Sequence, residues 1–281
     1  MRTQDELKGI LSFVMSRTVP LAIENGFDQG VQGTGALFRL GGKPYFVTAC
    51  HVLEKLDFEK VGIPIAPADL VVARKVEGKP LLLKQAEIRT FRKATIAKPF
   101  DPRYDVAVVI LEDQGFVAAL EQTWTFLTAG NFLRPGERAG GYLVCGFPIS
   151  IGRRVGDSTL FPPLAIWTHR ISAPKEAIAF AAAPDPDTEV FFAYDKQALR
   201  SGQTIGSPEL HGISGSVVWA VLQGDETSAL WTPERQVRVA AIEFAFCHSR
   251  YVRAMKLNVL QRLFREIDAP AAREIAAAIY G

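Results

Sequence analysis

Three polar residues stand at the edges of apolar segments, and their side chains together could carry out acyl transfer. His51 follows the segment FVTAC at 46–50, Asp105 opens an apolar run at 106–111, and Ser214 precedes another at 217–222. An imidazole is the usual general base near neutral pH, and a carboxylate can hold it in one tautomer. A hydroxyl that gives its proton to this base becomes a nucleophile. Each residue alone also has an ordinary explanation, at a strand end or in a turn.

The order of these residues along the chain narrows the chemistry. Histidine, aspartate and serine occur in the order of chymotrypsin, which differs from the orders in subtilisin and in α/β-hydrolases. The G-x-S-x-G elbow of α/β-hydrolases is also missing, because Ser216 occupies its last glycine position. The sequence therefore favours a chymotrypsin-like arrangement over the other two.

The segments around these residues strengthen this interpretation. They read GTGALF at 33–38, VTACHV at 47–52, DVAVV at 105–109 and GISG at 212–215. In this order they resemble four motifs of the trypsin-like (chymotrypsin-fold) serine peptidase family: its G-[ST]-G strand, its T-A-x-H-V segment, its D-[IV]-A-[LV]-[LIV] segment and the start of its G-x-S-G-G motif. The resemblance runs over residues 19–250, which is most of the chain.

The resemblance implies a serine endopeptidase with a His51–Asp105–Ser214 triad. Ser214 would attack a peptide carbonyl, His51 would accept and return the proton, and Asp105 would orient the imidazole. The backbone N–H groups of Gly212 and Ser214 would form the oxyanion hole. Hydrolysis would pass through an acyl-enzyme and would need no metal and no cofactor. The expected partner is a polypeptide substrate.

A further set of residues is expected at the substrate. Pro208 takes the position six residues before the nucleophile, where an aspartate would indicate cleavage after Lys or Arg, so trypsin specificity is not predicted. The segment 241–245 is similar to the strand that pairs with substrate backbone, and a small or medium apolar side chain is the preferred substrate residue. Glu209 and His211 either reach the substrate or face solvent. The expected substrate-binding residues are Pro208, Glu209, His211, Glu243, Phe244 and Ala245.

Two alternatives to an active peptidase remain. Ser216 replaces the second glycine that follows the nucleophile in the family, and it could crowd the site. One alternative is therefore a catalytically impaired module of the same fold that binds peptides or partner proteins. The other is an esterase or another acyl hydrolase on a different fold.

The elements that must position these residues are mostly short strands. Apolar and β-branched segments separated by turn residues predict two groups of about six strands, and a helical spacing of apolar residues predicts a helix at 4–16 and helices after residue 250. Gly41-Gly42 is a hairpin signal. The predicted fold is all-β, with two six-stranded antiparallel barrels and terminal helices. The expected strands are 19–23, 35–40, 44–48, 70–74, 81–88, 106–111, 141–145, 164–172, 177–183, 190–194, 216–222 and 237–246.

The predicted domain boundaries follow from these groups. They are an N-terminal helix at 1–17, a first barrel at 18–125, a linker at 126–140, a second barrel at 141–250 and C-terminal helices at 251–281.

Composition excludes several other classes. The net charge is +2 and the basic residues are dispersed, so no nucleic-acid partner is expected. Apolar runs are too short to span a membrane, and the N-terminus lacks the pattern of a secretory signal. The cysteines at 50, 145 and 247 are odd in number and widely spaced, which argues against a disulfide framework and a zinc site. A cytoplasmic location is expected, and the oligomeric state is left open.

Overall fold

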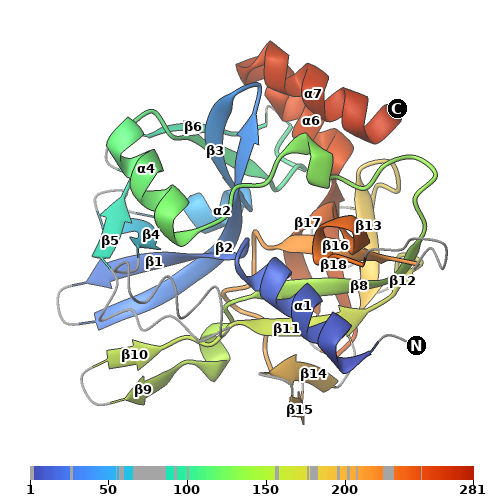
Figure 1. Cartoon of the computed structure of the whole chain (residues 1–281), viewed down its shortest axis with the longest axis horizontal. Coiled ribbons are helices and arrows are strands. Elements are labelled where there is room, and N and C mark those ends of the chain that lie inside the picture. Colours follow the sequence, from blue (N-terminus) through green and yellow to red (C-terminus); the bar gives the residue numbers. More distant parts are fainter. Residues whose placement is uncertain are drawn as a thin grey trace.

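The protein consists of two curled antiparallel sheets with helices packed around them (Figure 1). Two antiparallel sheets with helices at both ends of the chain confirm the all-β prediction. The computed structural model describes residues 3–25, 28–54, 56, 60–65, 87–91, 94–99, 101–155, 158–175, 177, 183–194, 197–200, 203–206, 208–223, 231–247 and 249–281.

The first sheet holds the segments of His51 and Asp105. In the described residues it has seven strands in the order β5-β4-β1-β2-β3-β7-β6. β2 and β3 are joined by a tight hairpin at Gly41 and Gly42, whose φ angles of 55° and 79° suit the glycines that the sequence places there. The strands are β1 (Val19–Asn25), β2 (Asp28–Leu40), β3 (Lys43–Thr48), β4 (Val61–Ile65), β5 (Glu87–Thr90), β6 (Thr95–Ala97) and β7 (Ala107–Ile110).

The second sheet holds the segment of Ser214. Its nine described strands follow the order β12-β13-β18-β17-β16-β8-β11-β14-β15, and β9 and β10 form a separate hairpin. The strands are β8 (Ala139–Gly146), β9 (Arg153–Val155), β10 (Ser158–Leu160), β11 (Leu164–Thr168), β12 (Arg170–Ile171), β13 (Glu189–Ala193), β14 (Gln197–Arg200), β15 (Gln203–Gly206), β16 (Val217–Leu222), β17 (Val237–Cys247) and β18 (Tyr251–Lys256).

Helices close the ends of the molecule. α1 begins at a capping box formed by Thr3 and Glu6, and it packs the edge of Phe13 on Trp219 of β16. None of the helices in the described segments is both long and apolar enough to cross a membrane. The helices are α1 (Gln4–Met15), α2 (Cys50–Leu53), α4 (Gln114–Thr123), α5 (Pro233–Gln236), α6 (Leu257–Ile267) and α7 (Ala269–Tyr280), with 3₁₀ turns η2 (Ala129–Asn131) and η3 (Ile149–Ile151).

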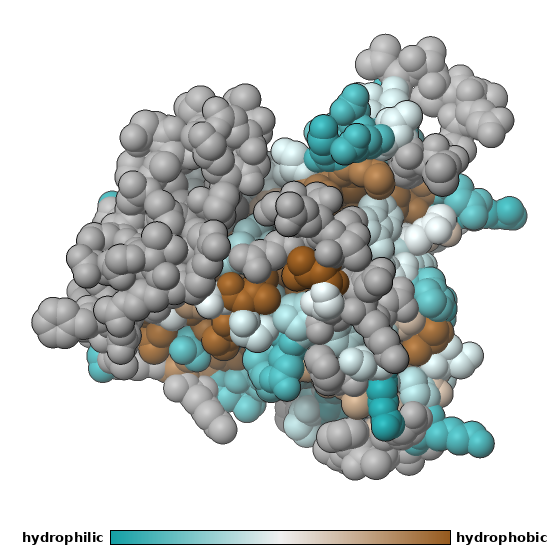
Figure 2. Space-filling view, turned by 90° about the horizontal axis from the view of Figure 1, so that it is seen from below, coloured by the Kyte–Doolittle hydropathy of each residue, from teal (hydrophilic) through white to brown (hydrophobic). Residues whose placement is uncertain are grey.

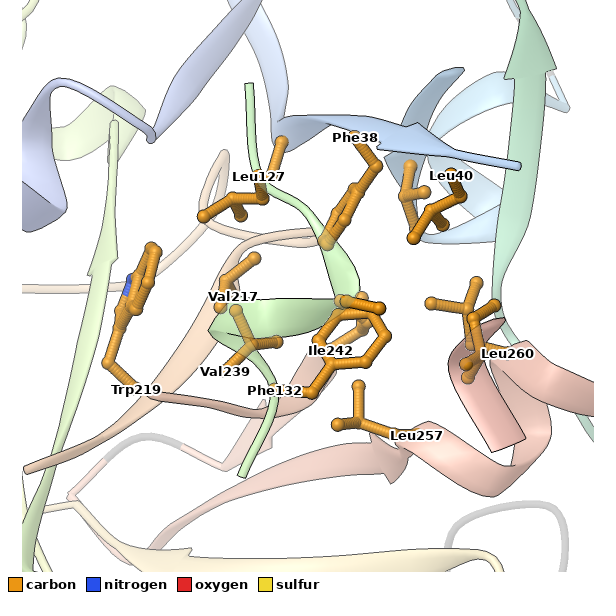
Figure 3. Packing of buried hydrophobic residues seen from close by; sticks show 14 of the residues in the cluster. Phe38, Leu40, Leu127, Phe132, Val217, Trp219, Val239, Ile242, Leu257 and Leu260 are labelled. Carbon is orange, nitrogen blue, oxygen red and sulfur yellow. The ribbon is translucent and has the colours of Figure 1, made fainter. Parts of the chain in front are cut away.

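One hydrophobic cluster joins the two sheets. Phe38 of the first sheet packs on Phe132, with ring centroids 5.8 Å apart, and both belong to a cluster that includes Val239 of β17 and Leu260 of α6 (Figure 3). Apolar surface shared in this way stabilises both sheets together. The junction between the sheets, where the site lies, therefore has a packed core beneath it.

Large apolar side chains are scarce on the described surface. Ile149 and Tyr280 are the exposed ones, with 46% and 62% of their surface accessible. In the view from below, hydrophobic side chains gather near the middle of the face and hydrophilic ones lie around them (Figure 2). Ile149 borders the candidate site, because a Cβ added at Gly212 would lie 3.0 Å from its Cγ1.

The element predictions hold for the strands that carry the site and fail at the C-terminal side. Residues 251–256 form strand β18 rather than the first turn of the expected helix, which begins at Leu257. Almost every residue of β18 is buried, so its sequence shows no alternation that would mark a strand. The helix α4 was not predicted. The expected strand 70–74 lies outside the described residues, as do most of 81–88 and 177–183.

Strand counts also exceed the six predicted for each barrel. The strands that were not predicted include β4, β6, β14 and β15, which are three to five residues long. A segment of this length carries too few residues for periodicity to reveal it.

Candidate active site

His51 and Asp105 lie at the same end of two paired strands. β3 pairs with β7 so that Thr48 stands opposite Ala107. His51 is the second residue of α2, which follows β3, and Asp105 comes two residues before β7. The pairing of the strands therefore places the imidazole beside the carboxylate.

Asp105 accepts two hydrogen bonds from His51. The backbone N–H of His51 donates to Oδ1 over 2.9 Å, and Nδ1 lies 2.6 Å from Oδ2. Because an ionised carboxylate can only accept, Nδ1 carries the proton and Nε2 presents its lone pair. The hydrogen bond that His51 donates to Asp105 raises the pKa of His51, and partial burial opposes this rise. The ring is oriented to act as a base through Nε2.

Ser214 lies in a tight loop between Leu210 and β16. Gly212 and Gly215 have φ angles of 95° and 91°, in the region that favours glycine, so the two flanking glycines are required by the loop. Gly215 N–H donates to the carbonyl of Glu243 over 2.8 Å, and Ser216 N–H donates to the carbonyl of Ile213 over 2.9 Å. These bonds hold the serine on a turn whose side chain is partly exposed.

The loop of Ser214 packs on the segment that leads to His51. Thr34 N–H of β2 donates to the carbonyl of Ser214 over 2.9 Å. A Cβ added at Gly215 would lie 2.8 Å from the backbone nitrogen of Ala49, two residues before His51. No hydrogen bond joins Ser214 Oγ to His51 in the described part of the chain. Catalytic hydrogen bonds in free enzymes are often long and shorten when substrate binds.

Two backbone N–H groups in the loop are free. The carbonyl of His211 accepts from Ile149 N–H over 2.7 Å, and the carbonyl of Ile213 accepts from Ser216 N–H. In a trans peptide the N–H points away from the carbonyl of the same peptide. The N–H of Gly212 therefore points away from Ile149, and the N–H of Ser214 points away from the N–H of Ser216. Neither N–H has a partner among the described residues. Such N–H groups can bind a developing oxyanion.

Thr34 is a residue of the site that the sequence interpretation treated only as part of a motif. It is fully buried, and its Oγ1 donates to the carbonyl of Gly212 over 2.7 Å and accepts from Phe147 N–H over 3.2 Å. Its own carbonyl accepts from Thr48 Oγ1 over 2.7 Å. Thr34 therefore ties the strand before His51 to both sides of the Ser214 loop. The motif G-T-G was the available signal.

The 3₁₀ turn η3 supports the same loop from the other side and was also not predicted. Ser150 Oγ donates to the carbonyl of Glu209 over 2.6 Å, next to the bond from Ile149 to His211. The loop is thereby fixed at Glu209 and at His211.

The expected substrate residues lie around this loop, with different exposure. Pro208 is partly buried, and its carbonyl accepts a hydrogen bond from the Tyr194 hydroxyl. Glu209 and His211 are exposed, with His211 Nε2 3.8 Å from a Glu209 oxygen. The His211 ring meets the ring of Phe246 edge-on at 5.2 Å.

The strand β17 has a free edge beside the loop. Ala245 and Phe246 pair with β18 on one side, and the described residues provide no strand on the other. Phe244 is an extra residue in this pairing, because the register shifts between Glu243 and Ala245. Its ring lies 5.3 Å from the guanidinium carbon of Arg253. An extended peptide could add to this edge.

Glu243 differs from the expectation for a substrate-binding side chain. It is fully buried, so a substrate could not touch its carboxylate. Both carboxylate oxygens are without a hydrogen-bond partner in the described residues. Burial raises the pKa of Glu243 well above its usual value, and the nearby charge of Asp105 raises it further.

A metal site is not evident around these residues. The described segments contain no group of three or more His, Cys, Asp or Glu side chains that could hold a metal ion.

Comparisons with known proteins give no family by sequence. No family model matches the chain, and no curated protein matches it. Among solved structures, a scabies mite inactivated protease paralogue, S-I1, matches with a TM-score of 0.48 and 11% identity over 91% of this chain and 95% of its own. A chain from a study of the coupled folding and binding of the disordered VPg protein of Sesbania mosaic virus matches with a TM-score of 0.45 and 11% identity over 87% of both chains.

Proposed function

We propose that the protein is a serine endopeptidase that uses His51, Asp105 and Ser214. The observation that carries this proposal is the meeting of three features at one strand junction. The first is the doubly hydrogen-bonded His51–Asp105 pair. The second is the Ser214 loop, which is bonded to Thr34 of β2, and the third is the two N–H groups in that loop that have no partner in the described residues. This combination matches the requirements of acyl transfer.

In this mechanism Ser214 Oγ attacks the peptide carbonyl while His51 Nε2 takes the hydroxyl proton. The negative charge that forms on the carbonyl oxygen is bound by the N–H groups of Gly212 and Ser214. The imidazolium then gives its proton to the leaving amine, and an ester to Ser214 remains. Water attacks this ester by the same route, which releases the acid and restores the hydroxyl.

The substrate would lie extended along the free edge of β17. The substrate backbone would add to the strand beside Phe244 and Ala245. Pro208 and the loop through His211 would border the substrate side chain at the cleaved bond. A proline rather than an acidic residue at 208 favours a small or medium apolar side chain at the cleaved bond.

A fluorophosphonate probe tests the proposal directly. It should label Ser214 in the wild-type protein, and labelling should vanish in Ser214→Ala and His51→Ala. The matched control is Ser216→Ala, because Ser216 is fully buried two residues away and its hydroxyl has no partner in the described residues. Labelling that persists in Ser214→Ala, or cleavage of a peptide library by that variant, would refute the proposal.

A catalytically impaired module that binds peptides is the second candidate. It is favoured by the missing hydrogen bond between Ser214 and His51 and by Ser216 at the position of a glycine. In this case the folded protein would resist the probe and still bind extended peptides at the edge of β17. Cleavage of small esters without peptide cleavage would instead indicate an esterase.

A further inference from the structure

The carboxyl group of Glu243 is enclosed directly beneath the Ser214 loop. Its backbone carbonyl accepts from Gly215 N–H and its N–H donates to the carbonyl of Ser216, each over 2.8 Å. The side chain is fully buried, and neither oxygen has a hydrogen-bond partner in the described residues. An ionised carboxylate without partners is very costly in such a place, so the group is stable only with its proton.

Among the described residues, no positively charged side chain pairs with the Glu243 carboxyl. Glu243 stands opposite Ala254 of β18, and the neighbouring Arg253 is engaged by both oxygens of Glu189 at 2.7 and 2.8 Å. The charged group that acts on Glu243 is Asp105, which is also acidic. Its effect adds to that of burial.

The two acids differ in what they bind. Asp105 accepts two hydrogen bonds from His51. The Glu243 carboxyl accepts none from the described residues. Burial without a partner favours the neutral form of an acid, so Glu243 is the group that keeps a proton.

We propose that Glu243 keeps its proton beneath the Ser214 loop and acts as a positioning residue for the site. The neutral acid leaves no buried charge on the strand whose backbone binds Gly215 and Ser216. Loss of the proton would leave an unpaired ion there, because the carboxyl oxygens have no hydrogen-bond partner in the described residues. The inference rests on the proposed function only for its kinetic consequences.

The proton itself can be observed without any activity. The wild-type protein should show the infrared C=O band of a buried carboxylic acid at neutral pH, and Glu243→Gln should lack it. In Asp105→Asn the band should disappear at lower pH than in the wild type, because the neighbouring charge is gone. The matched control is Glu189→Gln, which alters a buried carboxylate that is paired with Arg253 and should keep the band.

Stability against pH gives a second readout. A buried acid with a raised pKa keeps a proton that the unfolded chain loses above the usual value of 4.5, so stability falls as pH rises from there to the folded pKa. In that window the unfolding constant of the wild type should increase about tenfold per pH unit relative to Glu243→Gln. Parallel pH curves for the two proteins, or a Glu243→Gln protein that fails to fold, would overturn the proposal.

The kinetic part separates a positioning role from a purely structural one. Wild-type kcat should fall at alkaline pH as Glu243 ionises, and Glu243→Gln should lack this alkaline limb. Glu243→Ala should lower kcat on the order of tenfold with little change in KM, and Gln should restore most of this loss. An alkaline limb that Gln leaves unchanged would contradict the positioning role. If the wild type has no peptidase activity, the proposed function fails, while the infrared band still decides where the proton lies.

Discussion

At the scale of single residues, the site depends on how Asp105 holds His51. Both carboxylate oxygens are used, one by the backbone N–H and one by Nδ1, so the ring has one orientation and one tautomer. The same bonds favour the charged imidazolium that the proposed reaction requires. The arrangement would support a base that is neutral before the attack and charged after it.

A prediction at this scale concerns the acidic limb of the pH profile. Activity should fall as pH drops through the pKa of His51, because an imidazolium cannot accept the proton of Ser214. The hydrogen bond that His51 donates to Asp105 raises the pKa of His51, so Asp105→Asn should move the acidic limb to lower pH. The same substitution should reduce kcat by about 10⁴, because the imidazole loses its fixed tautomer. Profiles of kcat/KM measured with one peptide substrate provide the comparison.

The control for this experiment is another acidic residue in the same segment. Asp101 is bound to Arg103 rather than to His51, so Asp101→Asn should leave the limb in place. A limb at the same pH in wild type and Asp105→Asn would mean that Asp105 does not set the pKa of His51.

Glu243 illustrates where residue-by-residue reading of the sequence ends. The chemistry-bearing side chains at 51, 105 and 214 were identified because their types, neighbours and order are visible in the sequence. Glu243 was expected in the strand that pairs with substrate backbone, but the burial of its side chain depends on how the sheets pack around that strand. This packing is set by residues distant in sequence, and the carboxyl is fully buried.

At the scale of elements, β2 is the strand that connects the two halves of the site. Through Thr34 it binds the carbonyls of both Ser214 and Gly212, although Gly212 is 178 residues away in sequence. Contacts over such a separation follow from the docking of the two sheets. Local motifs therefore located the loop and the base but could not show which residue joins them.

Thr34→Val tests this connection. The substitution keeps the shape of the side chain and removes the hydroxyl that donates to Gly212 and accepts from Phe147. The loss leaves buried polar groups unpaired, which costs about 1–3 kcal/mol, and it loosens the loop that carries the free N–H groups. We expect kcat to fall about 10²-fold with KM less affected, because the N–H groups of this loop would stabilise an oxyanion that forms only in the transition state.

Thr34→Ser is the matched variant for this test. It retains the hydroxyl and should recover most of the activity that Val loses. Equal activity in the Val and Ser variants would show that the hydroxyl of Thr34 does not support the loop. Steady-state kinetics with a peptide substrate, together with a melting curve for each variant, provide the measurement.

At the scale of the whole molecule, the expected linker at 126–140 is part of the interface between the sheets. Leu127 exchanges backbone hydrogen bonds with Leu37 and Arg39 of β2, and Leu133 N–H donates to the carbonyl of Val239 on β17. The segment is thus bonded to the first sheet at one end and to the second at the other. A free linker between independent barrels would make neither set of bonds.

Phe132 lies at the centre of this segment and gives the last prediction. It is fully buried between Phe38 and the strand of Val239, so Phe132→Ala leaves a cavity in the core that both sheets share (Figure 3). We expect a loss of about 3–5 kcal/mol in the free energy of unfolding. Because the cavity affects both sheets, far-UV circular dichroism and tryptophan fluorescence should shift together to lower denaturant concentration. Tyr280→Ala, at an exposed aromatic residue, should leave the midpoint unchanged. Separate transitions for the two probes in wild type would show that the sheets unfold independently and that the site between them lacks a common support.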